Sequence, residues 1–382
     1  MTDKPLVSVV LPCLDEEEAI GACIEKIQKT FAQMQLEGEI IVCDNGSTDN
    51  SVAIAERMGV HVVHQPLRGY GHAYHKGFAS ASGTYLVMGD ADDTYDFSLI
   101  PDFLDQLIHK GYDFVTGSRY LAGGHQSIPF LHRFFGNPLL TIILNTLFGT
   151  RYTDVYSGFR AFTRRAYDLI RPVSPGMEFN LELAINAGLA GLRIAEVPIQ
   201  LQPRKGKSKL RTVRDGWRSL RMMLLYCPNK VFIWPGFFFL VGGLLLHLLL
   251  LVNVISVEGR PLGALAGIFA TIFSVVGFEI LSLGLHAKTY SWSRRFDKQN
   301  PTLERFYKFF TFEVGLIVGM GLLIAGAMML LLQMTEWLMS YFLHTLHPGW
   351  TSLAATLMII GLGTIFSSLF ISAMSITLKD TQ

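Results

Sequence analysis

The sequence is poor in charged residues, in cysteine and in the common nucleotide-binding motifs. Only 16% of its 382 residues are charged, whereas 50% are hydrophobic. Its four cysteines form no CxxC pair and show no metal-ligand spacing, so we expect reduced, packed thiols without a catalytic role. No GxGxxG follows the first predicted strand and no GxxxxGKS/T occurs, which argues against a dinucleotide-binding fingerprint and a P-loop.

The beginning of the sequence also lacks the features of a secretory signal peptide. Its apolar run, LVSVVLPCL, is too short, and acidic residues follow it immediately. We therefore expect the N-terminal region to stay in the cytoplasm.

Long apolar stretches are abundant after Lys230. They cover about residues 231–255, 262–285, 314–335 and 351–376. Each stretch reaches the roughly 20 residues that a helix needs to cross a bilayer. We therefore predict four transmembrane helices rather than the buried helices of a soluble protein.

The loops between these stretches predict the orientation of the chain. Segment 287–308 holds six Lys or Arg, whereas segment 336–349 holds none. By the positive-inside rule, the catalytic region and both chain ends then face the cytoplasm, in a cell inner or plasma membrane. Glu279 lies within the second stretch, where an ionisable group is costly, so we expect it to pair across helices or to lie near the inner interface.

Residues 6–117 alternate between short β-branched runs and helical stretches. The runs expected to form strands are LVSVVL, EIIVCD, VHVVH, TYLVMGD and DFVTGS. From Glu16 to Met34, apolar residues recur at helical spacing. This alternation predicts an α/β domain with a parallel sheet, right-handed crossovers and helices on both faces.

Acidic residues gather where three of these predicted strands end. PCLDEEE follows the first strand, DNGSTD the second and GDADD the fourth. Four aspartates lie close together after the fourth strand: Asp90, Asp92, Asp93 and Asp96. They could form a polar turn, but parallel strands bring all three clusters to one sheet edge, where ligands bind. We favour a metal-dependent nucleotide site, because Mg²⁺ takes a few carboxylates and completes its shell with phosphate oxygens.

Several motifs in order resemble a known enzyme family over roughly residues 5–225. They are VVLPCLDEEEAI, IIVCDNGSTDNS, RGYGHAYHKGFASASGTYLVMGDADDTYDF, TGSRY, SGFRAF and GLRIAEVPI. Together they resemble family 2 glycosyltransferases, and more narrowly the polyprenyl-phosphate glycosyltransferases of the dolichol-phosphate mannose or glucose synthase type. The resemblance implies a GT-A fold, which is Rossmann-like with a mostly parallel sheet.

The resemblance also implies roles for individual residues. The nucleotide pocket would be formed by Pro12, Asp15, Glu16 and Asp44. Asp90 and Asp92 would form the DxD pair that holds Mg²⁺ or Mn²⁺ against the sugar diphosphate, while Arg119 and Arg133 would grip the acceptor phosphate. Many relatives carry Gln where this chain has Thr94, which puts a further metal contact in doubt. Helix N-caps at Asp15 or Asp44, and a structural ion pair at Arg119, are the alternatives.

A basic segment precedes the first apolar stretch. Between Arg204 and Arg221 there are eight Lys or Arg and one acid. PRKGKSKLR supplies candidate phosphate clamps, namely Arg204, Lys205, Lys207 and Lys209, although the same run could be a solvated face. The residues that follow have helical spacing with one basic and one apolar face, which predicts an interfacial helix. Residues 138–148 are too short to span and predict either a second interfacial helix or a core helix.

The sequence thus predicts a GT-A domain at 1–203, a basic loop and interfacial helix at 204–230, and a membrane domain with four helices at 231–382. The expected reaction is inverting transfer of one hexose from a UDP-glucose- or GDP-mannose-class donor to polyprenyl phosphate on the cytoplasmic leaflet. Such an acceptor is already an anion and needs no general base, although Asp92, Asp93 or Glu178 could serve as one. We expect membrane lipid but no nucleic acid as a partner, and the sequence leaves open whether the protein is a homo-oligomer.

Other functions stay open at this point. A glycolipid synthase would transfer the sugar to a lipid hydroxyl. A processive polysaccharide synthase is disfavoured, because such relatives carry QxxRW and this chain has none. A membrane scaffold or transporter that binds nucleotide sugars without turning them over is the alternative outside the enzymes.

Overall fold

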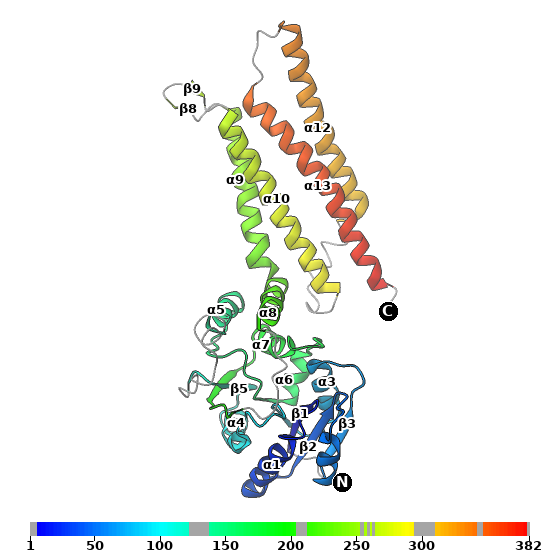
Figure 1. The fold of residues 1–382 in the computed structure, drawn as a ribbon. Helices are drawn as coiled ribbons and strands as arrows, with labels where there is room; N and C mark the ends of the chain where they lie inside the picture. Colours follow the sequence, from blue (N-terminus) through cyan, green and yellow to red (C-terminus); the bar gives the residue numbers. More distant parts are fainter. Residues whose placement is uncertain are drawn as a thin grey trace. The chain divides into compact units, whose positions relative to one another are not determined.

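The computed structural model describes residues 6–121, 137–203, 212–252, 256–257, 260–261, 264–293, 310–341 and 347–379. The chain forms two compact units, Met1–Met223 and Leu224–Gln382. The first carries the sheet and the second carries long apolar helices (Figure 1).

The first unit is built on a seven-stranded sheet in the order β3-β2-β1-β4-β6-β5-β7. The strands are β1 (Val7–Cys13), β2 (Gly38–Asp44), β3 (His61–His64), β4 (Tyr85–Met88), β5 (Phe114–Ser118), β6 (Arg160–Thr163) and β7 (Ile194–Pro198). All neighbours pair in parallel except β6, which is antiparallel to both β4 and β5. The mostly parallel sheet and the first five strands predicted from the sequence are therefore confirmed.

Helices connect and cover these strands. They are α1 (Ile20–Met34), α2 (Ser51–Arg57), α3 (Tyr70–Ser80), η1 (Phe97–Leu99), α4 (Ile100–Ile108), α5 (Asn137–Phe148), α6 (Arg164–Ile170), α7 (Phe179–Leu189) and α8 (Thr212–Tyr226). The first helix begins four residues later than its pattern predicts. The chain forms a turn there first, in which the backbone N–H of Ala19 donates to the carbonyl of Glu16 at 3.0 Å.

The alternation of side chains along the strands gives the sheet two covered faces. On one face, α1 and α4 pack against strand residues such as Val9, Val87 and Val115, which are fully buried. On the other face lies a group of aromatic side chains from α3, α7 and the strands, with Tyr74 stacked on Phe179 at 5.4 Å between ring centroids. Burial on both faces explains why these strands are almost continuously apolar.

The second unit contains the helices that are long and apolar enough to cross a membrane. By length and composition there are four within the residues that the structure describes: Asn229–Leu251, Ala264–Tyr290, Phe312–Met339 and Pro348–Met374. They comprise η4 (Asn229–Ile233), α9 (Trp234–Leu251), α10 (Ala264–Ser293), α12 (Phe312–Met339) and α13 (Pro348–Lys379), and a short hairpin of β8 (Ser256–Val257) and β9 (Arg260–Pro261) joins two of them. The prediction of four spans is confirmed.

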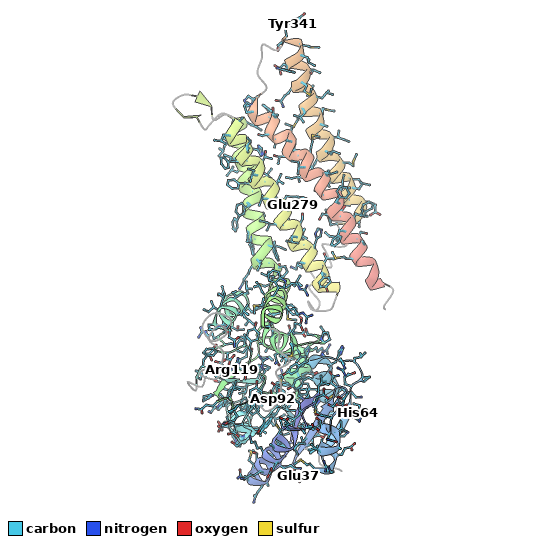
Figure 2. All side chains as sticks on the ribbon, in the orientation of Figure 1. Glu37, His64, Asp92, Arg119, Glu279 and Tyr341 are labelled. Atoms are coloured by element: carbon cyan, nitrogen blue, oxygen red, sulfur yellow. The ribbon has the colours of Figure 1, made fainter. Side chains whose placement is uncertain are left out.

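Small residues and one buried histidine hold these helices together. A side chain at Gly319 of α12 would meet the backbone of Gly361 in α13, so both positions allow the two helices to approach closely. His247 of α9 is buried, and its Nε2 lies 3.0 Å from Oγ1 of Thr356 in α13. That hydroxyl donates in turn to Thr271 of α10 at 3.0 Å. Glu279, by contrast, is exposed on α10 (Figure 2).

The buried cysteines give a test of the packing around the sheet. Cys13, Cys23 and Cys43 are free and at most 1% exposed, and burial raises their pKa values to about 11, 12 and 12. Because the thiolate is the reactive form, iodoacetamide at pH 8 should leave all three unmodified in the native protein and alkylate them after denaturation. Mass spectrometry of the digested protein would show this, and rapid native alkylation of any of the three would contradict the packing.

Candidate active site

The acidic segment after β1 is joined to the loop after β2 by side-chain hydrogen bonds. Oδ1 of Asp15 accepts from the backbone N–H of Thr48 at 2.7 Å, and Asp15 itself has a φ of 51°. The backbone N–H of Glu16 donates to Oγ of Ser51 at 2.8 Å. The cap residue of α1, the helix that follows Asp15, is Ala19, and that of α2 is Asn50. Asp15 therefore fastens two loops at the carboxyl ends of neighbouring strands and is not a helix N-cap.

Asp44 lies at the end of β2 and is only 6% exposed. Its carboxylate accepts from the backbone N–H groups of Ser47 at 2.9 Å and Gly46 at 3.3 Å, and Nδ1 of His64 lies 3.1 Å from it. Burial alone raises the pKa of Asp44, but these hydrogen bonds outweigh it, so the pKa falls below its usual value. A charged acceptor is thus fixed at the sheet edge, beside the half-buried Pro12 at the end of β1.

Two of the four aspartates after β4 have structural partners. Asp93 has a φ of 62° and pairs with Nζ of Lys26 on α1 at 2.6 Å. Asp96 caps η1, because its carboxylate accepts from the backbone N–H of Ser98 at 3.0 Å. The polar-turn interpretation is therefore correct for these two. Asp93 is thus paired with a cation, and the hypothesis that it could act as a general base stays a prediction.

The other two aspartates, Asp90 and Asp92, have neutral hydroxyl donors. Asp92 is 5% exposed, and its Oδ1 accepts from the hydroxyl of Thr94 at 2.6 Å. Oδ1 of Asp90 accepts from the hydroxyl of Tyr70 on α3 at 2.8 Å. Thr94, the residue that departs from the pattern of many relatives, thus contacts the second aspartate of the predicted pair.

Glycine at position 158 keeps space beside Asp90. A Cβ there would lie 3.2 Å from Oδ2 of Asp90 and 3.0 Å from the hydroxyl of Tyr95. No three His, Cys, Asp or Glu side chains cluster as a metal cage in the part of the chain that the structure describes. Two carboxylates, with a glycine in place of a larger side chain next to Asp90, fit Mg²⁺ or Mn²⁺, which would take its remaining ligands from a diphosphate and water.

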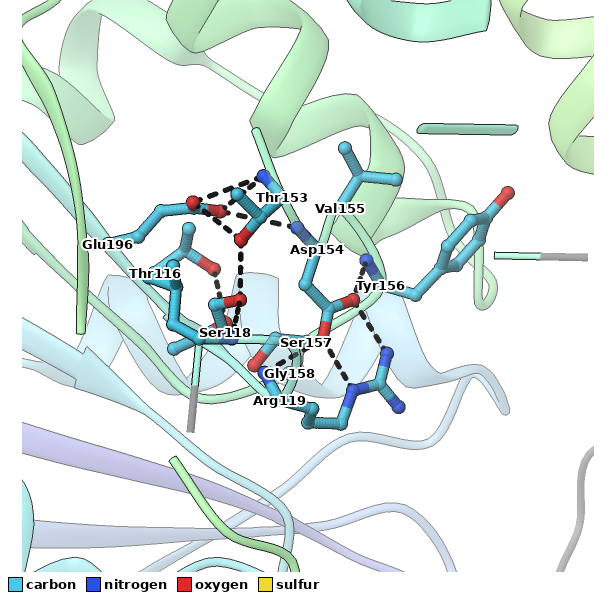
Figure 3. A network of polar contacts seen from close by, with 12 residues as sticks. Thr116, Ser118, Arg119, Thr153, Asp154, Val155, Tyr156, Ser157, Gly158 and Glu196 are labelled. Atoms are coloured by element: carbon cyan, nitrogen blue, oxygen red, sulfur yellow. Dashed lines mark hydrogen bonds and ion pairs between the residues drawn. The ribbon is translucent and has the colours of Figure 1, made fainter. Parts of the chain in front are cut away.

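Arg119 directly follows β5 and forms a bidentate ion pair with Asp154 (Figure 3). Its Nε donates to Oδ2 at 2.5 Å and its Nη2 donates to Oδ1 at 2.7 Å. Burial alone would lower the pKa of Arg119, but Asp154 raises it above its usual value. The structural ion pair that was the alternative at this position is present, and Nη1 lies outside it. The contact of Arg119 with an acceptor phosphate stays a prediction.

A second network, made of hydrogen bonds, stabilises the loop that contains Asp154. Glu196 of β7 accepts from the backbone N–H and the hydroxyl of Thr153, at 2.9 and 2.7 Å (Figure 3). The hydroxyls of Thr153 and Ser118 lie 2.5 Å apart. The residue before Asp154 is thereby tied to both β5 and β7, which fixes the ion pair at the end of the sheet.

Arg160 was not among the residues predicted from the sequence, although it makes several buried contacts in this region. It is fully buried, and its guanidinium donates to the backbone carbonyls of Val155, Ser157 and Asn180 at 2.6, 2.9 and 2.5 Å. It thus ties the loop before β6 to the start of α7. The sequence does contain an indication of this role, because Arg160 lies among apolar residues and a buried arginine almost always has polar partners.

Comparison with known proteins identifies the family. The model of glycosyl transferase family 2 matches residues 8–170, and that of the family 2 C-terminal transmembrane region matches residues 285–375. The low-salt glycan biosynthesis hexosyltransferase Agl6 of Haloferax volcanii is 36% identical over 375 residues, covering 97% of this chain and 89% of that protein. The chain belongs to glycosyltransferase family 2.

Further similarities of this glycosyltransferase are shorter. The dolichyl-phosphate hexose transferase of Haloferax volcanii is 34% identical over 225 residues, covering 59% of this chain and 95% of that protein. The crystal structure of glucosyl-3-phosphoglycerate synthase from Mycobacterium tuberculosis with Mn²⁺, uridine diphosphate and phosphoglyceric acid has a TM-score of 0.46 at 24% identity, covering 58% and 76% of the two chains. The family, the GT-A fold and the enzyme class predicted from the motifs are confirmed.

Several predicted contacts of the glycosyltransferase fall outside the described residues. They are Arg133, Arg204, Lys205, Lys207 and Lys209. The helices that flank these segments are described, and both carry exposed apolar side chains. Leu139 and Ile142 of α5 are 56% and 62% exposed, and Trp217 of α8 is 64% exposed. The opposite face of α5 is buried at Leu144, so this helix combines a core face with an exposed apolar face.

The buried ion pair predicts a large effect of one substitution. Asp154→Ala would leave Arg119 buried without its carboxylate, so we expect the catalytic unit to lose about 3 kcal/mol of stability. Asp105→Ala is the matched control, because its pair with Lys110 is exposed and should contribute less than about 1 kcal/mol. Thermal unfolding in detergent would compare the two variants, and equal effects would show that the buried pair is not structural.

Proposed function

We propose that this glycosyltransferase moves one hexose from a nucleotide sugar to polyprenyl phosphate on the cytoplasmic leaflet of the membrane. The observation that carries the proposal is the pair Asp90 and Asp92, placed after β4 with hydroxyl partners while their neighbours Asp93 and Asp96 are engaged elsewhere. A UDP-glucose- or GDP-mannose-class donor fits a diphosphate site of this kind.

The donor side of the reaction needs charge stabilisation. The bond between the anomeric carbon and the diphosphate oxygen breaks, and the nucleoside diphosphate keeps the electron pair. When bound between Asp90 and Asp92, Mg²⁺ or Mn²⁺ would neutralise part of the charge that develops on this leaving group. Asp44, Asp15 and Glu16 would line the nucleotide pocket, where Asp44 offers a fixed carboxylate to a base or ribose donor.

The acceptor side needs positioning rather than proton removal. An oxygen of the lipid phosphate is already anionic, so it can attack the anomeric carbon from the side opposite the leaving group and invert the configuration. Arg119 lies at the end of β5 with Nη1 outside its ion pair, which supports a contact with this phosphate. Arg133, Arg204, Lys207 and Lys209 complete the proposed set of cations.

The membrane location supports a lipid acceptor. The second unit makes this an integral membrane protein, and the exposed apolar residues of α5 and α8 suit an interfacial position of both helices. The excess of Lys and Arg in segment 287–308 favours a cytoplasmic catalytic unit. The name of the dolichyl-phosphate hexose transferase that matches over 225 residues agrees with a polyprenyl phosphate acceptor.

An acceptor comparison tests the proposal. Purified full-length protein would be given radiolabelled UDP-glucose or GDP-mannose with Mn²⁺ and either polyprenyl phosphate or the corresponding polyprenol. We expect labelled lipid only with the phosphate, and the label should be released by mild acid. An acid-stable product formed on a lipid hydroxyl would instead indicate a glycolipid synthase, and nucleotide binding without turnover would indicate a scaffold or transporter.

Two isosteric substitutions separate the roles of the clustered aspartates. Asp92→Asn should lower transfer by at least about a hundredfold, because the metal and the charge it compensates are lost. Asp96→Asn should keep most of the activity, because asparagine caps a helix as well as aspartate does. Initial rates at several Mn²⁺ concentrations would measure both, with thermal unfolding as the folding control. Full transfer by Asp92→Asn would refute the metal assignment.

A further inference from the structure

Tyr70 lies between the catalytic sheet edge and the segment that enters α7. Its hydroxyl donates to Oδ1 of Asp90 at 2.8 Å, while Nδ2 of Asn180 donates to the same hydroxyl at 3.2 Å. An ionised carboxylate can only accept, so the tyrosine proton must point to Asp90 and the amide must supply the second hydrogen bond. The donors in these two hydrogen bonds are therefore known: Asn180 donates to Tyr70, and Tyr70 donates to Asp90.

The backbone of Tyr70 is held from the other side by residues 173–176. Tyr70 stands between Gly69 and Gly71, and a Cβ on either glycine would collide with the carbonyl oxygen of Pro175 or Ser174 respectively. The backbone N–H of His72 also donates to the carbonyl of Pro175 at 3.2 Å. Only glycines allow this close approach, so the backbone at residues 69–72 packs directly against the backbone at residues 174–175.

The segment that holds Tyr70 is itself anchored by a buried carboxylate. Glu182 of α7 is fully buried and accepts from the backbone N–H groups of Val173 at 3.0 Å and Ser174 at 2.7 Å. The carbonyl of Asn180 accepts in turn from the buried guanidinium of Arg160 at 2.5 Å. Both ends of Tyr70, its backbone and its hydroxyl, are therefore fixed by residues 173–180.

We propose that Tyr70 is a positioning residue that holds the Asp90 carboxylate in the orientation needed to bind the divalent cation, and that residues 173–180 hold Tyr70 in place. The inference rests on the proposed function, because it assumes that Asp90 is a metal ligand. Hydrogen-bond partners of ligating carboxylates fix ligand orientation, and their loss typically lowers metal affinity by about 10- to 100-fold.

Direct binding of Mn²⁺ provides a test that does not depend on turnover. Free Mn²⁺ would be followed by electron paramagnetic resonance in titrations of the full-length protein with UDP or GDP present. Tyr70→Phe removes only the hydroxyl, and we expect it to raise the dissociation constant for Mn²⁺ about tenfold. Asn180→Ala should raise it in the same direction but by less, because the bond between Tyr70 and Asp90 survives.

Tyr152→Phe is the matched control. Tyr152 is a buried tyrosine of the same unit whose hydroxyl donates to the backbone carbonyl of Ala184 at 3.1 Å. Its loss should lower the unfolding temperature about as much as Tyr70→Phe while leaving Mn²⁺ affinity within twofold of the wild type. Equal Mn²⁺ affinities for the two variants would overturn the inference.

A third variant separates the inference from the proposed function. Asp90→Asn should abolish the nucleotide-dependent binding of Mn²⁺. If it does so while Tyr70→Phe and Asn180→Ala bind normally, the metal assignment stands and the positioning role is wrong. If Asp90→Asn itself binds Mn²⁺ normally, the metal assignment fails and the role of Tyr70 fails with it.

Discussion

The arrangement of negative charge at the carboxyl end of β4 is the constraint on which the rest of the site depends. Four aspartates within seven residues would repel one another without compensation. Lys26 neutralises Asp93, and Asp96 accepts a hydrogen bond from the backbone N–H of Ser98 in η1. Asp90 and Asp92 receive hydrogen bonds from the hydroxyls of Tyr70 and Thr94, which orient their carboxylates. Two neighbouring carboxylates of this kind are suited to binding a divalent cation.

The surrounding fold serves to keep this pair at a fixed place. The loop before β6 comes close to Asp90 at Gly158, and Arg160 ties that loop to α7 through backbone carbonyls. Burying a guanidinium is costly unless its donors are satisfied, and here three backbone carbonyls accept hydrogen bonds from it. The same region contacts α8, where Arg218 lies 3.6 Å from Glu178. A helix predicted to lie at the membrane surface is thus paired with the residue that precedes α7.

Much of this could be predicted from sequence because it depends on local patterns. Apolar strand runs, the acidic clusters that follow them and the long apolar stretches each identify their elements within a few residues. The residues that orient the site could not be predicted, because their partners are distant in the chain. Tyr70 and Asn180 are 110 residues apart, and Arg119 and Asp154 are 35 residues apart. The antiparallel position of β6 between β4 and β5 likewise depends on contacts between distant segments, which local patterns do not predict.

Anomalous diffraction at the manganese edge would test the central claim most directly. Crystals of the full-length protein grown with Mn²⁺ and UDP or GDP should show a manganese peak within coordination distance of both the Asp90–Asp92 pair and the diphosphate, with Tyr70 still bonded to Asp90. A manganese peak bound elsewhere on the diphosphate, with Asp90 and Asp92 turned away from it, would contradict the account.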